Sequence, residues 1–238
     1  MTSRRPFAGV NQMREAARLV GLVPIAVVVA LGVGFLLRWK LPVGGFLALQ
    51  FPAGKDDLES LVGDRDDPRR AKTYRQLDID TRIFIPVYWA LLVAVAVVFA
   101  FRDRWWAPWV GGAAAAAATL AALLDLLENE RTLRVLDTPL AETTDADARS
   151  IRSAAQKKWV AAILSVALIG ALFVGKDMPE VATWLGRGYW AAAAAGVVGL
   201  VYRPLLGGFM LLTGVSVLAT LVVLGFDIDD FPLDFFRY

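Results

Sequence analysis

The sequence has no cysteine and no histidine, and only 20% of its 238 residues are charged. The lack of cysteine excludes disulfides, thiolate nucleophiles and cysteine-bound zinc or iron–sulfur centres. The lack of histidine excludes histidine-ligated haem, Ser-His-Asp catalysis and most transition-metal chemistry. We therefore expect no metal site and no cofactor.

Acidic and basic residues are nearly balanced, with 23 Asp and Glu against 25 Lys and Arg. Proteins that bind nucleic acid carry a strongly basic surface, so this balance argues against nucleic acid as a partner. Apolar residues, in contrast, make up 57% of the chain. That proportion is too high for an ordinary soluble domain and indicates an integral membrane protein embedded in a lipid bilayer.

Five uncharged apolar runs are each long enough for a helix that crosses the roughly 30 Å hydrocarbon core of a bilayer. They cover Leu19 to Leu37, Ile83 to Phe101, Trp105 to Leu124, Trp159 to Gly175 and Pro204 to Phe226. A sixth run, Gly188 to Tyr202, is long enough if it starts at Val181 and Arg187 extends to the headgroups. The pattern predicts an all-α, polytopic transmembrane helix bundle of about six spans.

Basic residues indicate the orientation, since cytoplasmic loops of membrane proteins are enriched in Lys and Arg. Residues 38–82 contain nine of them and residues 125–158 contain six. We therefore expect both loops in the cytoplasm of a multi-pass protein of the plasma membrane. Four arginines before the first run fit this orientation only if that run enters and leaves the membrane on one face. Whether it spans, and on which side the N-terminus lies, stays open.

Two loops contain signals for the start of a helix. Asp67 followed by Pro68 is typical of an N-cap with proline in the first turn, and predicts a helix that runs into the second span. Thr144 with Asp147 three residues later resembles a capping box and predicts a helix that leads into the fourth span. The apolar stretch Leu41 to Phe51 is expected at the membrane interface.

The most informative polar residues stand at the end of the third span. Asp125, Glu128 and Asn129 are spaced i, i+3 and i+4, which places them on one face of a helix. Ala118 and Ala121 extend that face, and small residues favour contact between helices. Because ionisable side chains turn away from lipid, we expect Asp125 to point into the bundle.

The topology brings further polar residues to the same membrane surface, because the second and fourth spans start where the third ends. These residues are Asp78, Asp80 and Tyr88 at the second span, and Arg131, Lys157 and Lys158 between the third and the fourth. Asp125 lies deepest and needs one of the three basic residues as its partner. Pro86 leaves a helical carbonyl without its usual donor, so we expect a polar notch at this level.

Ordinary interfacial ion pairing is the alternative explanation of the same residues. Pairs at helical spacing are Asp78 with Arg75 or Arg82, Glu128 with Arg131, and Glu130 with Arg134. Exposed pairs of this kind contribute only about 0 to 1 kcal/mol. Two acidic triplets, within residues 64–67 and 227–230, imitate a magnesium site, but solvated turns or helix caps explain both.

Four short elements occur in an order that resembles a group of uncharacterised bacterial membrane proteins. The elements are LALQF (47–51), FIPVY (84–88), DLLEN (125–129) and AAQKKW (154–159). The resemblance covers about residues 20–175. It implies a four-span core with interfacial loop helices in residues 19–175, preceded by a basic segment (1–18) and followed by two additional spans and an acidic tail (176–238).

The resemblance extends to several candidate site residues. Asp125, Glu128 and Asn129 match the family's D-x-x-E-N element, and Lys158 matches the lysine that opens the fourth span. The family also has an aspartate shortly before F-I-P-x-Y. Asp78 and Asp80 are the candidates for this aspartate here. Both are displaced from the family's position, because Thr81 stands at the matching place in this sequence. The family implies no activity.

Three functions are compatible with these residues. The first is a membrane protein that binds a lipid, an amphiphile, a partner subunit or a second copy of itself through the cytoplasmic-side cluster. In it, Asp125, Glu128 and Asn129 hold the polar end of the ligand, while Arg131 and the two lysines hold a phosphate. The alternatives are a lipid-directed enzyme with carboxylate acid–base chemistry and, with less support, a proton- or cation-coupled transporter. No residue is assigned a catalytic role.

Overall fold

The computed structural model describes residues 43–63, 66–101, 104–175 and 180–225, and within these ranges every regular element is a helix. In chain order the α-helices are α2 (Val43–Gln50), α3 (Lys55–Val62), α4 (Pro68–Ile79), α5 (Ile85–Ala100), α6 (Ala107–Asp137), α7 (Asp145–Leu172), α8 (Glu180–Val201) and α9 (Pro204–Gly225). A π-helical turn, Asp80–Phe84, joins α4 to α5. The basic segment 1–18, the first predicted span and the acidic tail lie outside the described residues.

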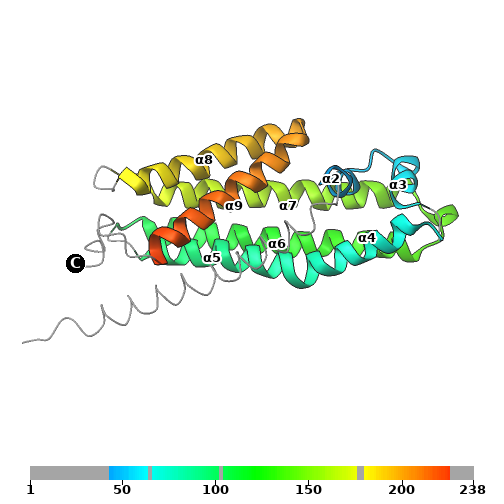
Figure 1. Ribbon diagram of the computed structural model, residues 1–238, viewed down its shortest axis with the longest axis horizontal. Helices are drawn as coiled ribbons and strands as arrows, with labels where there is room; N and C mark the ends of the chain where they lie inside the picture. The colour runs from blue at the N-terminus through cyan, green and yellow to red at the C-terminus, as the bar shows by residue number, and fades with distance from the viewer. Residues whose placement is uncertain (1–42, 64–65, 102–103, 176–179, 226–238) are drawn as a thin grey trace, which may run out of the picture.

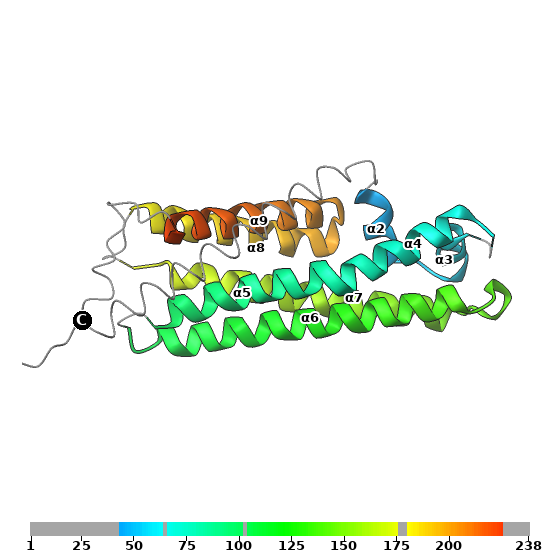
Figure 2. The same ribbon diagram turned by 60° about the horizontal axis from the view of Figure 1, so that its bottom comes forward.

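The long helices form a bundle in which α5, α6, α7, α8 and α9 each pack against the next in the chain (Figures 1 and 2). The three short helices α2, α3 and α4 lie at one end of this bundle, beside the ends of α6 and α7 (Figure 2). Most of the two predicted loops, residues 38–82 and 125–158, is therefore helix. The long helices continue through them beyond the apolar runs.

Four of the described helices are long and apolar enough to cross a membrane. They are Pro68–Ala100, Ala107–Asp137, Asp145–Leu172 and Pro204–Val223. They correspond to the second, third, fourth and sixth predicted spans, and they confirm the prediction of an all-α fold with several helices that could cross a membrane. The fifth predicted span forms α8, a helix of 22 residues.

Both predicted helix starts are confirmed. The Asp67 carboxylate accepts a 2.8 Å hydrogen bond from the backbone N–H of Arg69, and α4 and α5 continue from there into the second span. Hydrogen bonds from Arg69 also hold the pKa of Asp67 below its usual value. At α7, Thr144 and Asp147 form a reciprocal capping box.

The structure has two hydrophobic cores along its length. The larger one lies among the long helices and includes Val95, Ala118, Val166 and Ala192. The smaller one lies at the end with the short helices and consists of Leu49, Leu58, Val62, Leu77, Val135, Leu136, Ala148 and Ile151. The short helices are therefore packed onto extensions of α6 and α7 rather than loosely tethered.

Arg70 fixes the end of α6 from the neighbouring α4. Its side chain is 6% exposed, and its guanidinium donates to the backbone carbonyls of Leu136 (Nε, 2.9 Å) and Thr138 (2.8 Å). The last carbonyls of a helix lack partners within the helix, so a buried helix end needs donors of this kind. The planar guanidinium supplies several donors at once, which a lysine cannot.

Replacing Arg70 by methionine is expected to lower the free energy of unfolding by about 2 to 3 kcal/mol, because buried carbonyls at the end of α6 lose charged donors. Unfolding of the protein in detergent micelles measures the effect. Arg75→Met, an exposed position on the same helix, is the control and is expected to stay within about 0.5 kcal/mol. Equal effects of the two substitutions would contradict this role of Arg70.

Candidate functional site

A group of buried polar side chains lies between the two hydrophobic cores, where α5, α6 and α7 meet. We call it the junction cluster, and it consists of Asp80, Tyr88, Asp125, Glu128, Asn129 and Lys158. All six were candidates in the sequence. Except for Tyr88, which is half-buried, their exposed fractions lie between 2% and 8%.

The ammonium group of Lys158 is the centre of the cluster. Its Nζ lies 2.8 Å from Asp125 Oδ1 and 2.6 Å from Glu128 Oε2. Tyr88 donates a 3.0 Å hydrogen bond from its hydroxyl to the other oxygen of Asp125. Two carboxylates on adjacent turns of α6 thus hold one lysine of α7, as the i, i+3 spacing allows.

The π-helical turn brings Asp80 to the same place. The N–H of Ile85 bonds to the carbonyl of Asp80, five residues back, directly before Pro86. Proline has no N–H and its ring crowds the preceding turn, so a widened turn accommodates it. The predicted notch at Pro86 is therefore a π-helical turn.

Asn129 joins Asp80 to the rest of the cluster. Its Nδ2 donates to Asp80 Oδ2 at 2.8 Å and to Thr81 Oγ1 at 3.0 Å. The charges of Asp125 and Lys158 also act on Asp80. The polar group on α6 and the acidic residue before α5 therefore form one site.

Two groups in the cluster have unused capacity for a donor. Asp80 has no cationic partner within hydrogen-bonding distance among the described residues, and Asn129 Oδ1 is buried without a hydrogen-bond partner there. Three carboxyl groups face a single ammonium group. The arrangement is thus deficient in positive charge and in N–H donors.

The other candidates lie elsewhere. Asp78 is exposed and pairs with Arg82 at 2.6 Å, as the ion-pair alternative predicted. Lys157 is exposed on α7. Arg131 donates a 2.7 Å hydrogen bond to the Ser150 carbonyl.

The ion-pair alternative named three acidic residues; it is right for Asp78 and Glu130 and wrong for Glu128. Glu130 pairs with Arg134 at 3.0 Å. Glu128 does not pair with Arg131, because its side chain turns inward to Lys158 and Arg131 bonds to a carbonyl of α7. The buried and exposed carboxylates on α6 therefore have different roles.

Sequence reasoning missed two features of the site. It could not choose between Asp78 and Asp80, because residues two apart point to nearly opposite sides of a helix and the π-helical turn shifts the register. It also did not predict the contact of Thr81, whose hydroxyl accepts a hydrogen bond from Asn129. The only sequence signal for both was Pro86.

The cluster has the chemistry of a charged binding site or a proton site. In the part of the chain that the structure describes, no three acidic residues are grouped so that they could hold a metal ion. Asp125 and Glu128 are both engaged by Lys158. The groups left to act on another molecule are Asp80, Asn129 Oδ1 and the Tyr88 hydroxyl.

Comparison with known protein families, with curated proteins and with solved structures finds no match. The resemblance to a bacterial membrane protein family in residues 20–175 therefore stays a prediction. The function has to be inferred from the geometry of the site.

Replacing Lys158 alone by methionine is expected to reduce the free energy of unfolding by about 3 to 5 kcal/mol, because it leaves two buried carboxylates without a counter-charge. The triple variant Lys158→Met, Asp125→Asn, Glu128→Gln is expected to recover most of that loss. Unfolding in detergent micelles measures both.

The exposed pair Glu130 and Arg134 on the same helix provides the control. Arg134→Gln is expected to change the free energy of unfolding by no more than about 1 kcal/mol. A triple variant as unstable as Lys158→Met alone would show that the charge pairing is not what stabilises the junction.

Proposed function

We propose that the chain is a multi-pass membrane protein that binds the amine end of a lipid or another amphiphile at the junction cluster. The supporting observation is the buried Asp80 carboxylate, which lacks a cationic partner among the described residues and lies beside the unpartnered Asn129 Oδ1. An ammonium group offers a positive charge and three N–H donors, and no acceptor. It therefore supplies what both groups lack.

The charge balance of the cluster supports the same conclusion. Three buried carboxyl groups with one ammonium group are costly unless further positive charge or protons compensate them. Grouped metal ligands are absent from the described residues, so a metal ion is not an obvious source of that charge. An amine provides it with directional donors.

The surface outside the cluster is suited to an amphiphile. Ile83 and Phe84 belong to the π-helical turn that begins at Asp80, and their side chains are 43% and 41% exposed. The Phe84 ring packs against Tyr88, with centroids 5.5 Å apart. An acyl chain can lie on this apolar surface while its polar end approaches Asp80 beside the Tyr88 hydroxyl.

The sequence also suggested that Arg131 and the two lysines hold a phosphate, and this part of the hypothesis has less support. Lys158 is occupied by two carboxylates, and Arg131 is bonded to the Ser150 carbonyl. Only Lys157 is exposed and without such a contact among the described residues. Binding of a partner subunit or a second copy of the chain stays a prediction.

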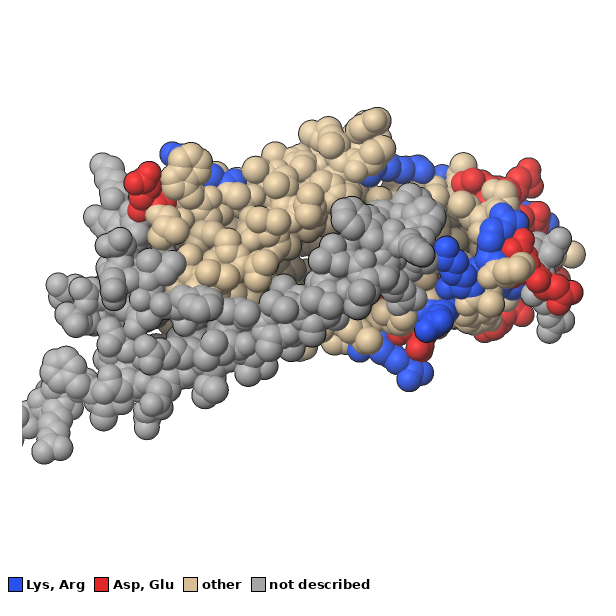
Figure 3. Space-filling model, in the orientation of Figure 1, with Lys and Arg blue, Asp and Glu red and all other residues tan. Residues whose placement is uncertain are grey.

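We also infer six spans, with the junction cluster near the cytoplasmic surface of the plasma membrane. In Figure 1, α8 runs back along α7 from the end of that helix to the start of α9, beside α2, and its 22 residues are long enough to cross a hydrocarbon core, which supports its crossing the membrane. Figure 3 shows basic side chains gathered between the apolar body and the acidic tip of the end that contains α3. Basic residues at that level favour a cytoplasmic side.

The test compares two lipids that differ only in the nitrogen of the headgroup. Phosphatidylethanolamine has N–H donors and phosphatidylcholine has none, so the purified protein is expected to retain the first about tenfold more tightly, as measured by native mass spectrometry. Asp80→Asn is expected to abolish this preference, because it removes the charge without unpairing Lys158. Asp125→Asn combined with Glu128→Gln should also abolish it.

Two controls separate binding from folding. Lys157→Gln removes an exposed charge of α7 and Arg134→Gln removes an exposed charge of α6, both outside the cluster; both variants are expected to keep the preference for phosphatidylethanolamine. Circular dichroism checks that every variant is folded. Equal retention of the two lipids by the natural sequence, or an unchanged preference in folded Asp80→Asn, would overturn the proposal.

A proton-coupled transporter is the second candidate, favoured by one further observation. Tyr88, Asp125, Lys158 and Glu128 form a continuous chain of hydrogen bonds and ion pairs, and such chains occur in proton relays. In this case a proton, not an amine, compensates the excess acid. The lipid-directed enzyme has no comparable contact in its favour, because Asp125 and Glu128 are both bound to Lys158.

A pH jump across liposomes that contain the protein tests this second candidate. A transporter is expected to show proton movement that Asp125→Asn suppresses and Arg134→Gln leaves unchanged. Liposomes with the natural sequence that conduct no more than empty ones would exclude it.

A further inference from the structure

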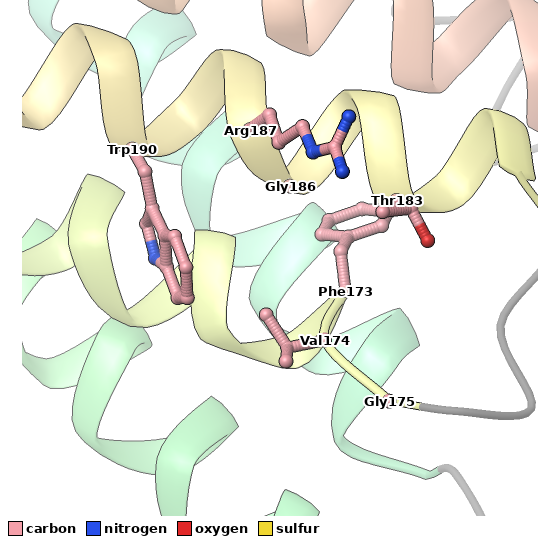
Figure 4. Close-up of a pocket in the computed structure, with 7 residues that line it drawn as sticks. All are labelled: Phe173, Val174, Gly175, Thr183, Gly186, Arg187 and Trp190. Atoms are coloured by element: carbon pink, nitrogen blue, oxygen red, sulfur yellow. The ribbon is translucent and has the colours of Figure 1, made fainter.

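A groove of about 380 Å³ lies between α7 and α8, at the end of the bundle opposite the short helices. Figure 4 shows its lining, which includes Phe173 and Val174 directly after α7 and Gly186, Arg187 and Trp190 from α8. The volume is within the range of about 300 to 1,000 Å³ that small-molecule sites occupy. All but a small part of the lining is apolar.

The shape of the groove is fixed by glycines and by a hydrogen bond. A Cβ atom on Gly186 would lie 2.8 Å from the Cβ of Phe173, so only glycine permits this approach of α8 to α7. A Cβ on Gly170 would lie 2.7 Å from Trp190 Nε1. Trp190 also donates a 3.1 Å hydrogen bond to the Ala167 carbonyl, which holds its ring as one wall of the groove.

Arg187 is the cationic side chain in the lining of the groove, and the guanidinium of Arg104 lies close by, against Gly175. Arg187 is exposed, and its guanidinium lies 4.7 Å from the centre of the Trp184 ring. It forms no ion pair or hydrogen bond with any described residue, and the aromatic contact leaves its N–H donors available. An anionic group is the ligand that these donors fit best.

The surroundings of the groove are typical of the membrane surface. Exposed tryptophans surround this end of the bundle, and Trp105, Trp109 and Trp184 are 85%, 77% and 59% exposed. Tryptophan concentrates at the boundary between hydrocarbon and headgroups. Val174 and Trp190, which form sides of the groove, are themselves 45% and 46% exposed and continue the surface that faces lipid.

We propose that this groove binds an anionic phospholipid of the bilayer, with an acyl chain along Val174 and Trp190 and the phosphate on Arg187. The positive charge of Arg187 matches the phosphate of such a lipid, and the apolar lining matches its acyl chain. The site is separate from the junction cluster: Phe173, directly after α7, lies fifteen positions beyond Lys158, about 22 Å at 1.5 Å per residue. It does not depend on the proposed function.

Native mass spectrometry of the full chain tests the site with phosphatidylglycerol and phosphatidylcholine of identical acyl chains. The natural sequence is expected to retain one phosphatidylglycerol in preference to phosphatidylcholine. Arg187→Gln is expected to weaken that binding roughly tenfold, the effect of one lost charge-assisted contact. Val174→Trp, which fills the groove, should abolish it.

Arg134→Gln removes an exposed arginine at the other end of the bundle, and Val160→Trp enlarges an exposed valine of α7 outside the groove; both should bind like the natural sequence. Arg187 makes no hydrogen bond with the described residues, so Arg187→Gln is expected to fold. This variant decides the test even if Val174→Trp fails to fold. Equal retention of the two lipids, or unchanged binding in Arg187→Gln, would overturn the proposal. Asp80→Asn should leave this binding unchanged, so the two proposals can fail separately.

Discussion

The ammonium group of Lys158, buried inside a helix bundle, imposes the strictest condition on this structure. Removing such a charge from water costs several kcal/mol, and only close counter-charges with good geometry offset that cost. Asp125 and Glu128 provide them at 2.8 and 2.6 Å, both from α6. The contact therefore fixes the position of α7 relative to α6, along the most extensive helix pair of the fold.

The packing around that contact follows from it. Ala114 and Ala118 are fully buried on the face of α6 that carries Asp125, and Ser165 of α7 donates a 2.9 Å hydrogen bond to the Ala114 carbonyl. Small residues let the two backbones approach closely enough for short side chains to meet between them. The apolar cores on either side of the cluster limit the access of water, which strengthens the interactions between its charges.

Stability and function require different things from the same cluster. Lys158 is ion-paired with both Asp125 and Glu128, which suits a structural role. Asp80 and Asn129 Oδ1 retain unused acceptor capacity, which a binding role requires and a purely structural cluster would avoid. The far end of the bundle has the opposite chemistry, since the groove at Arg187 has a cation and no acidic partner among the described residues. The two proposed sites thus differ in the sign of the charge that they offer a ligand.

The sequence by itself determined the helical class, the level of the polar group and the starts of α4 and α7, because these depend on local apolar runs, helical spacing and caps. It also grouped Asp125, Glu128, Asn129 and Lys158 at one level of the bundle, where the structure brings them together. Only the tertiary structure decided which lysine pairs with Asp125 and which aspartate before α5 turns inward. Those choices depend on the rotation of each helix about its axis, which is set by packing and by the π-helical turn at Asp80–Phe84. The groove at Arg187 was beyond prediction for the same reason, since it exists only where α7 and α8 meet.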